Sequence, residues 1–230
     1  RVVELYARPV SGAGVPVKLN GVLVAGGDVL DFRLSQDGRT VVFSADALID
    51  GKNELFGVPS DGSAPPIQLN GAFGDDFDVD AFELSPDGRG VVYHDTRLPS
   101  RLRSVLSSGG TVLNLAAGVT PFEITPDSAR VLFHPLSLSS LSSIPIAGGA
   151  IASLDGGHFV AEYRLSPDGT RLALLVNEDD EYEEFESLYA VPVTGGTPVR
   201  LSAPPVTDGG IASFALSDER AVFVGAFVVE

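Results

Sequence analysis

The chain has 230 residues, 44% of them hydrophobic, which is enough for a sizeable buried core. Its 31 acidic and 15 basic residues give a formal net charge of −16, so its surface would repel phosphate backbones and nucleic-acid binding is not expected. Cysteine is absent, which excludes disulfides, thiolate metal sites and a cysteine nucleophile.

In chain order, the first predicted elements are two strands within residues 3–19, because VELYARPVSGAGVPVKL matches the second half of the repeat that follows it. Four full repeats are then predicted, at about 28–70, 78–116, 119–155 and 160–202. The last segment, 211–230, contains only the first half of a repeat.

One short phrase marks every copy of the repeat. It reads FRLSQDG at 32–38, FELSPDG at 82–88, FEITPDS at 122–128, YRLSPDG at 163–169 and FALSDER at 214–220. The copies lie roughly 40 to 50 residues apart, a period typical of repeat architectures. Because single repeats cannot bury their apolar faces alone, we expect one domain over residues 1–230.

The second repeat shows what each copy contains. Residues 79–84 and 90–93 are short, apolar and rich in β-branched or aromatic residues, which predicts two strands joined by the tight turn SPDG. In that turn proline presets φ, aspartate bonds its own backbone and glycine accepts a positive φ. Residues 104–106 and 111–115 predict two more strands on either side of the turn SSGG. Each repeat is therefore predicted to be a four-stranded antiparallel sheet.

The repeat resembles that of a known family. F-x-L-S-P-D-G, an apolar strand and then L-Y-x-V-P-x-x-G-G is similar to the WD40-like repeat of TolB-type β-propellers. This resemblance implies a propeller fold, and propellers of this type serve as interaction domains, periplasmic scaffolds and gating domains of peptidases. The tryptophan common before SPDG in that family is replaced here by aliphatic residues, which predicts smaller, purely aliphatic packing at Leu34, Leu84, Ile124, Leu165 and Leu216.

We therefore predict an all-β, five-bladed β-propeller of four-stranded antiparallel blades. Its fifth blade would combine residues 1–20 with 211–230, so that pairing of the N- and C-terminal strands closes the ring and removes two open sheet edges. The alternative is a piece cut from a larger propeller, for example one with six blades.

The acidic residues are predicted to gather on one face. In a propeller, the loops after the second and fourth strands of each blade lie on the same side, and these loops contain most of the carboxylates. Such a face could bind a basic peptide, or Ca²⁺, since hard cations prefer carboxylate oxygens. The candidate binding residues are Asp75, Asp76, Asp78, Asp95, Glu178, Asp179 and Asp180, with the aromatic Tyr182 and Phe185.

The second candidate group lies on the first strand of each repeat, which we call the inner strand because it is nearest the central channel of a propeller. It consists of the middle residue of each inner strand. Arg33, Glu83, Glu123 and Arg164 occupy equivalent positions in successive repeats. Because partly buried charges need partners, we expect ion pairs between blades around the channel, Arg33 with Glu83 and Glu123 with Arg164. A site for a polar ligand at the mouth of the channel is the alternative.

Catalytic chemistry has little support in the sequence. His94 and His134 follow matching strands of neighbouring repeats and are weak candidates for a metal site in the channel. No phosphate loop, H-E-x-x-H or G-x-S-x-G motif occurs, so no catalytic residue is predicted. The aspartates of the turns, Asp37, Asp87, Asp127 and Asp168, are interpreted as local caps.

Three functional hypotheses follow. The sequence favours a non-catalytic binding or scaffold module that recognises a cationic protein or peptide through the acidic loop face. No cofactor is predicted, and Ca²⁺ on that face is the alternative. The alternative is a hydrolase or lactonase-like enzyme with a metal in the central channel. The third is one module of a longer chain or assembly, such as a peptidase-linked propeller.

The location of the protein is predicted from the same sequence. No apolar run approaches the roughly 20 residues of a membrane span. A chain that starts at Arg1 and lacks methionine fits a processed protein or an excised domain. A removed signal peptide would place it in the periplasm or outside the cell.

Overall fold

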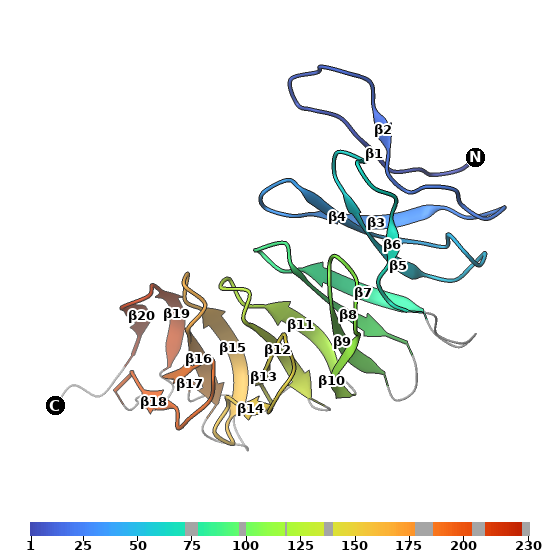
Figure 1. The fold of residues 1–230 in the computed structure, drawn as a ribbon. Helices are drawn as coiled ribbons and strands as arrows, with labels where there is room; N and C mark the ends of the chain where they lie inside the picture. Colours follow the sequence, from blue (N-terminus) through green and yellow to red (C-terminus); the bar gives the residue numbers. More distant parts are fainter. Residues whose placement is uncertain are drawn as a thin grey trace. The chain divides into compact units, whose positions relative to one another are not determined.

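A computed structural model describes residues 1–71, 78–96, 100–117, 119–135, 140–177, 186–203 and 210–226. Over these ranges the ordered elements are all β-strands. The same ranges contain no helix that is long and apolar enough to cross a membrane. The chain divides into two compact units: unit 1 holds Arg1–Val119 with Ile146–Gly148, and unit 2 holds Thr120–Pro145 with Gly149–Glu230. Each unit is built from consecutive antiparallel sheets (Figure 1).

Four sheets have four strands each, ordered as in the sequence. The first sheet contains β3 (Val29–Leu34), β4 (Thr40–Ala45), β5 (Glu54–Pro59) and β6 (Ile67–Gln68). The second contains β7 (Val79–Leu84), β8 (Gly90–Asp95), β9 (Arg101–Leu106) and β10 (Leu113–Ala117). The third contains β11 (Val119–Ile124), β12 (Arg130–Pro135), β13 (Ser142–Pro145) and β14 (Ala152–Ser153). The fourth contains β15 (Phe159–Leu165), β16 (Arg171–Asn177), β17 (Glu186–Pro192) and β18 (Val199–Arg200).

Two smaller sheets come from the ends of the chain. The N-terminal pair is β1 (Tyr6–Ala7) with β2 (Val17–Lys18), and the C-terminal pair is β19 (Ile211–Leu216) with β20 (Ala221–Gly225). The predicted pairing of these terminal strands in one sheet is not among the strand pairings of the described residues, which form six separate sheets. One physical reason is the shortness of β1, which offers only two residues of paired strand to a further neighbour.

The recurring turn forms as predicted. The Ser35 hydroxyl donates to Asp37 Oδ1 at 2.7 Å, and the Arg39 N–H donates to the same oxygen at 3.0 Å. The bond from Ser35 lowers the pKa of Asp37. Gly38 completes the turn with φ at 72°, in the left-handed region that glycine enters without steric cost. The structure therefore confirms that the repeated aspartate caps its own turn.

The inner strands share a second feature. Their register against the next strand shifts between Val29 and Asp31, and equivalent shifts occur in β7, β15 and β19. Such a β-bulge bends the strand and changes the direction of the side chains next to it.

Apolar side chains between consecutive sheets form the cores. In unit 1, Phe43 stacks on Phe56 with ring centroids 5.3 Å apart, on the face of the first sheet that packs against Leu5 and Leu19 of the N-terminal pair. The aliphatic inner-strand residues Leu84, Leu165 and Leu216 pack against cores of this kind. Leu34 is 56% exposed, because the N-terminal pair has no inner strands to cover it.

The last strand of most repeats has only two residues, and side chains form hydrogen bonds beyond its end. The Leu5 N–H donates to Asn20 Oδ1 at 2.9 Å, and the Leu55 N–H donates to Asn70 Oδ1 at 3.2 Å. In unit 2 the same role falls to an aspartate, which accepts from the Leu141 N–H at 3.0 Å. At these three positions a polar residue directly after a leucine thus takes the place of missing strand hydrogen bonds.

Candidate functional site

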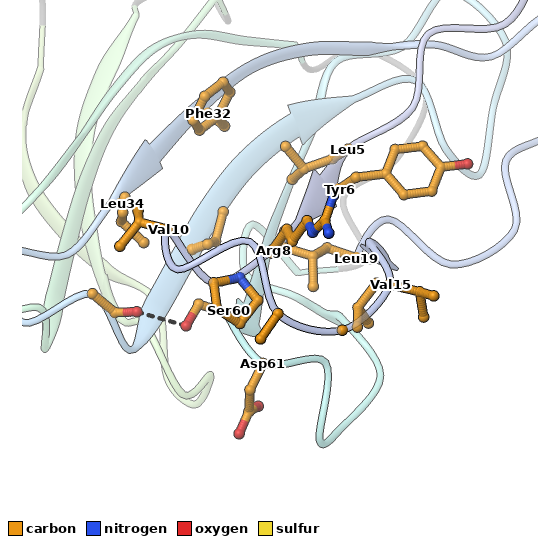
Figure 2. Close-up of a pocket in the computed structure, with 17 residues that line it drawn as sticks. Leu5, Tyr6, Arg8, Val10, Val15, Leu19, Phe32, Leu34, Ser60 and Asp61 are labelled. Carbon is orange, nitrogen blue, oxygen red and sulfur yellow. Dashed lines mark hydrogen bonds between the residues drawn. The ribbon is translucent and has the colours of Figure 1, made fainter.

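A hollow of about 700 Å³ opens in unit 1 between the N-terminal pair and strands β3 and β4 (Figure 2). We call it the N-terminal cleft. Leu5, Leu19 and Val41 are its buried residues. Phe32 and Leu34 of β3 line it with about half of their surface exposed. The cleft is therefore mostly apolar, which suits apolar side chains and not a charged ligand.

Polar groups around the cleft already have local partners. The Ser60 hydroxyl donates to the Gly38 carbonyl at 2.6 Å (Figure 2). Asp61 accepts a bond from the Ser63 N–H, and bonding by Ser63 lowers the pKa of Asp61. The Arg8 guanidinium donates to the Gly12 carbonyl. These contacts order the loops and place no nucleophile next to a base.

Both inner-strand arginines form ion pairs within their own strands. Arg33 Nη1 lies 2.8 Å from Asp31 Oδ2, and Arg164 Nη2 lies 2.8 Å from Glu162 Oε1. Residues two apart lie on the same face of a strand, so the carboxylate at this position is nearer than one on the next sheet. The arginines were predicted to pair between sheets, and the described pairs correct that expectation.

The contact between sheets at these positions is aromatic. Arg33 Cζ lies 5.2 Å from the ring centroid of Phe82 on β7, and Arg164 Cζ lies 5.2 Å from that of Phe214 on β19. Glu123 accepts a hydrogen bond from the Tyr163 hydroxyl at 3.2 Å. A guanidinium over a ring face is attracted by the ring quadrupole, so each arginine joins two neighbouring sheets.

Two members of the predicted acidic face lie in the described residues. Asp78 accepts the Asn53 N–H at 2.9 Å, which ties the second sheet to the first. The Asp95 side chain is only 3% exposed and accepts from Arg103 Nε at 2.6 Å. Asp95 therefore lies inside the sheet packing, whereas it was expected on the surface, because Arg103 supplies the partner that a buried carboxylate needs.

The other residues predicted for the acidic face lie outside the described residues. They are Asp75, Asp76, Glu178, Asp179, Asp180, Tyr182 and Phe185.

The predicted histidines lie in different units. His94 is buried on β8 in unit 1, with Nδ1 3.5 Å from Asp80 Oδ2. His134 is in unit 2, and its Nδ1 lies 2.7 Å from the Ser140 carbonyl oxygen. Within the described part of the chain, no group of three or more histidine, aspartate or glutamate side chains is placed to hold a metal ion.

A buried polar group in the second sheet was missed by the sequence analysis. Tyr93, opposite Arg103 in the register, is 1% exposed, and its hydroxyl has no hydrogen-bond partner among the residues that the structure describes. Burial raises the pKa of Tyr93. The matching pair in the first sheet is Phe43 and Phe56, so alignment of the repeats could have revealed that Tyr93 and Arg103 replace an aromatic stack.

No protein-family model matches the chain, and no curated protein matches it. Solved structures do match. Puromycin hydrolase has a TM-score of 0.52 at 22% identity, over 97% of this chain and 38% of that one. The tricorn protease has a TM-score of 0.55 at 14% identity, over 91% of this chain and 22% of that one. Prolyl oligopeptidase B from Galerina marginata has a TM-score of 0.50 at 14% identity, over 82% of this chain and 32% of that one.

These neighbours show the fold and correct one prediction. The chain is propeller-like, as predicted, although no TolB-type repeat family is matched. The chain spans between 22% and 38% of the lengths of these proteins. All three are hydrolytic enzymes, which contradicts the main hypothesis of a non-catalytic binding or scaffold module and agrees better with the alternative of a hydrolase. The predictions of a cationic partner and of a periplasmic or extracellular location stay predictions.

Proposed function

We propose that this chain is the β-propeller part of a hydrolase that acts on peptides. The observation that supports the proposal is the likeness of over 90% of this chain to a fraction of puromycin hydrolase and of the tricorn protease. A propeller occupying that fraction would stand beside a hydrolytic part and act as a rigid body that limits access to it.

The described residues agree with a protein in which the propeller and the catalytic residues belong to separate parts. None of the hydrogen bonds described for His94, His134 and His158 is made with a serine hydroxyl, so no serine–histidine pair is assembled in these ranges. In this proposal the residues that cleave the substrate come from another part of the same protein or from an assembled partner.

Recovery of the native protein tests this proposal. An antibody against the chain would be used to isolate it from cells of its source, and the product would be assayed on fluorogenic peptides. We expect the isolated material to hydrolyse peptides, while the recombinant 230-residue chain alone does not. Material from cells that lack the gene is the control. Isolation of the native protein without any peptide hydrolysis would contradict the proposal.

We also propose that the N-terminal and C-terminal pairs belong to one composite blade, giving a five-bladed ring. The sequence of β19 and β20 is the first half of a repeat, and that of β1 and β2 is the second half. By alignment with β4 and β5, β20 would pair with β1 so that Phe223 lies opposite Tyr6, as Phe43 lies opposite Phe56. The N-terminal cleft would then receive apolar side chains of the added strands.

The absence of native cysteine makes this architecture easy to test. In the proposed register Ala7 and Val222 are directly opposite, within the reach of a disulfide. We expect Ala7→Cys with Val222→Cys to give an intrachain disulfide on mild oxidation, seen by mass under non-reducing conditions. Ala7→Cys with Val199→Cys is the control. Exclusively intermolecular disulfides, or none, would overturn the composite blade.

A further inference from the structure

An aspartate, an arginine and a phenylalanine form a preorganised guanidinium site in unit 1. Asp31 lies just after the bulge of β3 and holds Arg33, whose Cζ is 5.2 Å from the centroid of the Phe82 ring. The contact with the ring fixes the plane of the guanidinium, and the contact with the carboxylate fixes its rotation. The Arg33 side chain is nevertheless 47% exposed, so part of the ordered group faces solvent.

The hydrogen bonds of Arg33 use one nitrogen only. Nη1 donates to Asp31 Oδ1 and Oδ2, both at 2.8 Å, and to the Phe32 carbonyl at 2.9 Å. Within the described residues, no acceptor is assigned to Nε or Nη2. These two nitrogens form the side of the guanidinium that can donate two parallel N–H···O bonds to a carboxylate.

The equivalent site in unit 2 is occupied on that same side. Arg164 Cζ stacks on Phe214 at the same distance of 5.2 Å. Its Nε and Nη2, however, both contact Glu162 Oε1, at 3.1 and 2.8 Å. Glu162 therefore binds the side of Arg164 that corresponds to the side of Arg33 without a described acceptor.

We propose that Arg33 is a binding site for a carboxylate group. Asp31 already offsets the charge of Arg33, and the whole chain has a net charge of −16, so a singly charged carboxylate is favoured over a phosphate dianion. Two sources share this chemistry: the C-terminus of a peptide and the side chain of an aspartate or glutamate. The site rests on contacts within unit 1 and holds whether or not the chain belongs to a hydrolase.

Three short peptides distinguish the sources. Acetyl-Ala-Ala-Ala has a terminal carboxylate, acetyl-Ala-Glu-Ala-amide has a side-chain carboxylate, and acetyl-Ala-Ala-Ala-amide has neither. Each is titrated into the ¹⁵N-labelled chain while the Nε–Hε signal of Arg33 is followed by NMR. A shift of that signal with either carboxylate peptide, and none with the neutral amide, supports the site, and the tighter peptide identifies the source. Equal shifts with all three peptides, or no shift with any, would overturn it.

Variants of Arg33 separate the contribution of its two parallel N–H donors from the contribution of its positive charge. We expect Arg33→Lys to weaken carboxylate binding roughly tenfold, because an ammonium keeps the charge but loses the two parallel donors. Arg33→Gln is expected to abolish it. Arg164→Gln, which changes the site already occupied by Glu162, is expected to leave the affinity unchanged. Wild-type affinity in Arg33→Lys, or an equal loss in Arg164→Gln, would show that specific recognition by Arg33 is absent.

Discussion

Replacing Asp95 by asparagine removes the negative charge from an ion pair that the second sheet buries. The side chains of Asp95 and Arg103 are 3% and 7% exposed, and 2.6 Å separates Asp95 Oδ2 from Arg103 Nε. Asparagine keeps an oxygen that can accept the Arg101 N–H, which now bonds Asp95 Oδ1 at 3.1 Å. The substitution therefore changes the charge and little else.

The expected loss is large because Arg103 stays buried beside a neutral partner. Breaking a buried pair from one side costs about 3–5 kcal/mol. For a chain of this size, each kcal/mol shifts the melting temperature by about 2–4 °C. We therefore expect Asp95→Asn to lower the melting temperature by roughly 6–20 °C in calorimetry, with a matching fall in the urea midpoint.

Replacing both partners should restore most of that loss. The first sheet has Ala45 and Phe56 at the positions of Asp95 and Arg103, and its core is closed by an aromatic stack. We expect Asp95→Ala with Arg103→Phe to unfold within about 1 kcal/mol of the wild type, since apolar replacement of a buried pair is often neutral or stabilising. If the double variant is as unstable as Asp95→Asn, the pair itself stabilises the sheet and the reasoning is refuted.

Four further substitutions test the packing, a buried carboxyl group and the turns. Tyr93→Phe removes a buried hydroxyl that has no partner in the described part of the chain and should stabilise the protein by about 1 kcal/mol in urea unfolding, whereas a loss of stability would reveal a bound partner. Burial raises the pKa of Glu54 above its usual value of 4.5, so stability should fall as pH rises from 4.5 through the pKa of the folded state. Glu54→Gln keeps an acceptor for the two backbone N–H groups, and that falling limb should disappear from its stability–pH curve. Ser128 has φ at 62° where the equivalent turns have glycine, so Ser128→Gly should raise the free energy of unfolding by about 1 kcal/mol. Gly38→Ala adds a Cβ with no atom near it, so only backbone strain should lower the free energy of unfolding, by about 1 kcal/mol. A loss of stability in Ser128→Gly or a gain in Gly38→Ala would contradict the strain argument.

The strands were predictable because their signals are local. Residues 79–84 form β7 as predicted, and the strand predicted at 90–93 is the start of β8, which extends to Asp95. Alternating apolar residues and the turn SPDG are enough to specify such a hairpin. The strand predicted at 104–106 begins earlier, at Arg101, because an arginine-rich segment gave no apolar signal.

The partners of charged residues were not predictable in the same way. Arg33 was assigned to Glu83 from equivalent positions in adjacent repeats, but the described ion pair is with Asp31, two residues away on the same strand. Asp95 was assigned to the surface as part of the loop after the second strand, yet it lies in β8 and pairs with Arg103 inside the packing. In both cases the long arginine side chain decided the pairing, and its direction depends on packing that the sequence does not show.

The sequence by itself determined the repeat, the order of the strands and the turns, because each depends on residues close together in the chain. Only the tertiary structure decided which carboxylate meets which arginine and where the N-terminal cleft opens. It also decided that the terminal strands form two separate pairs in the described residues. These features depend on the burial and direction of side chains from different sheets, and a local pattern does not encode them.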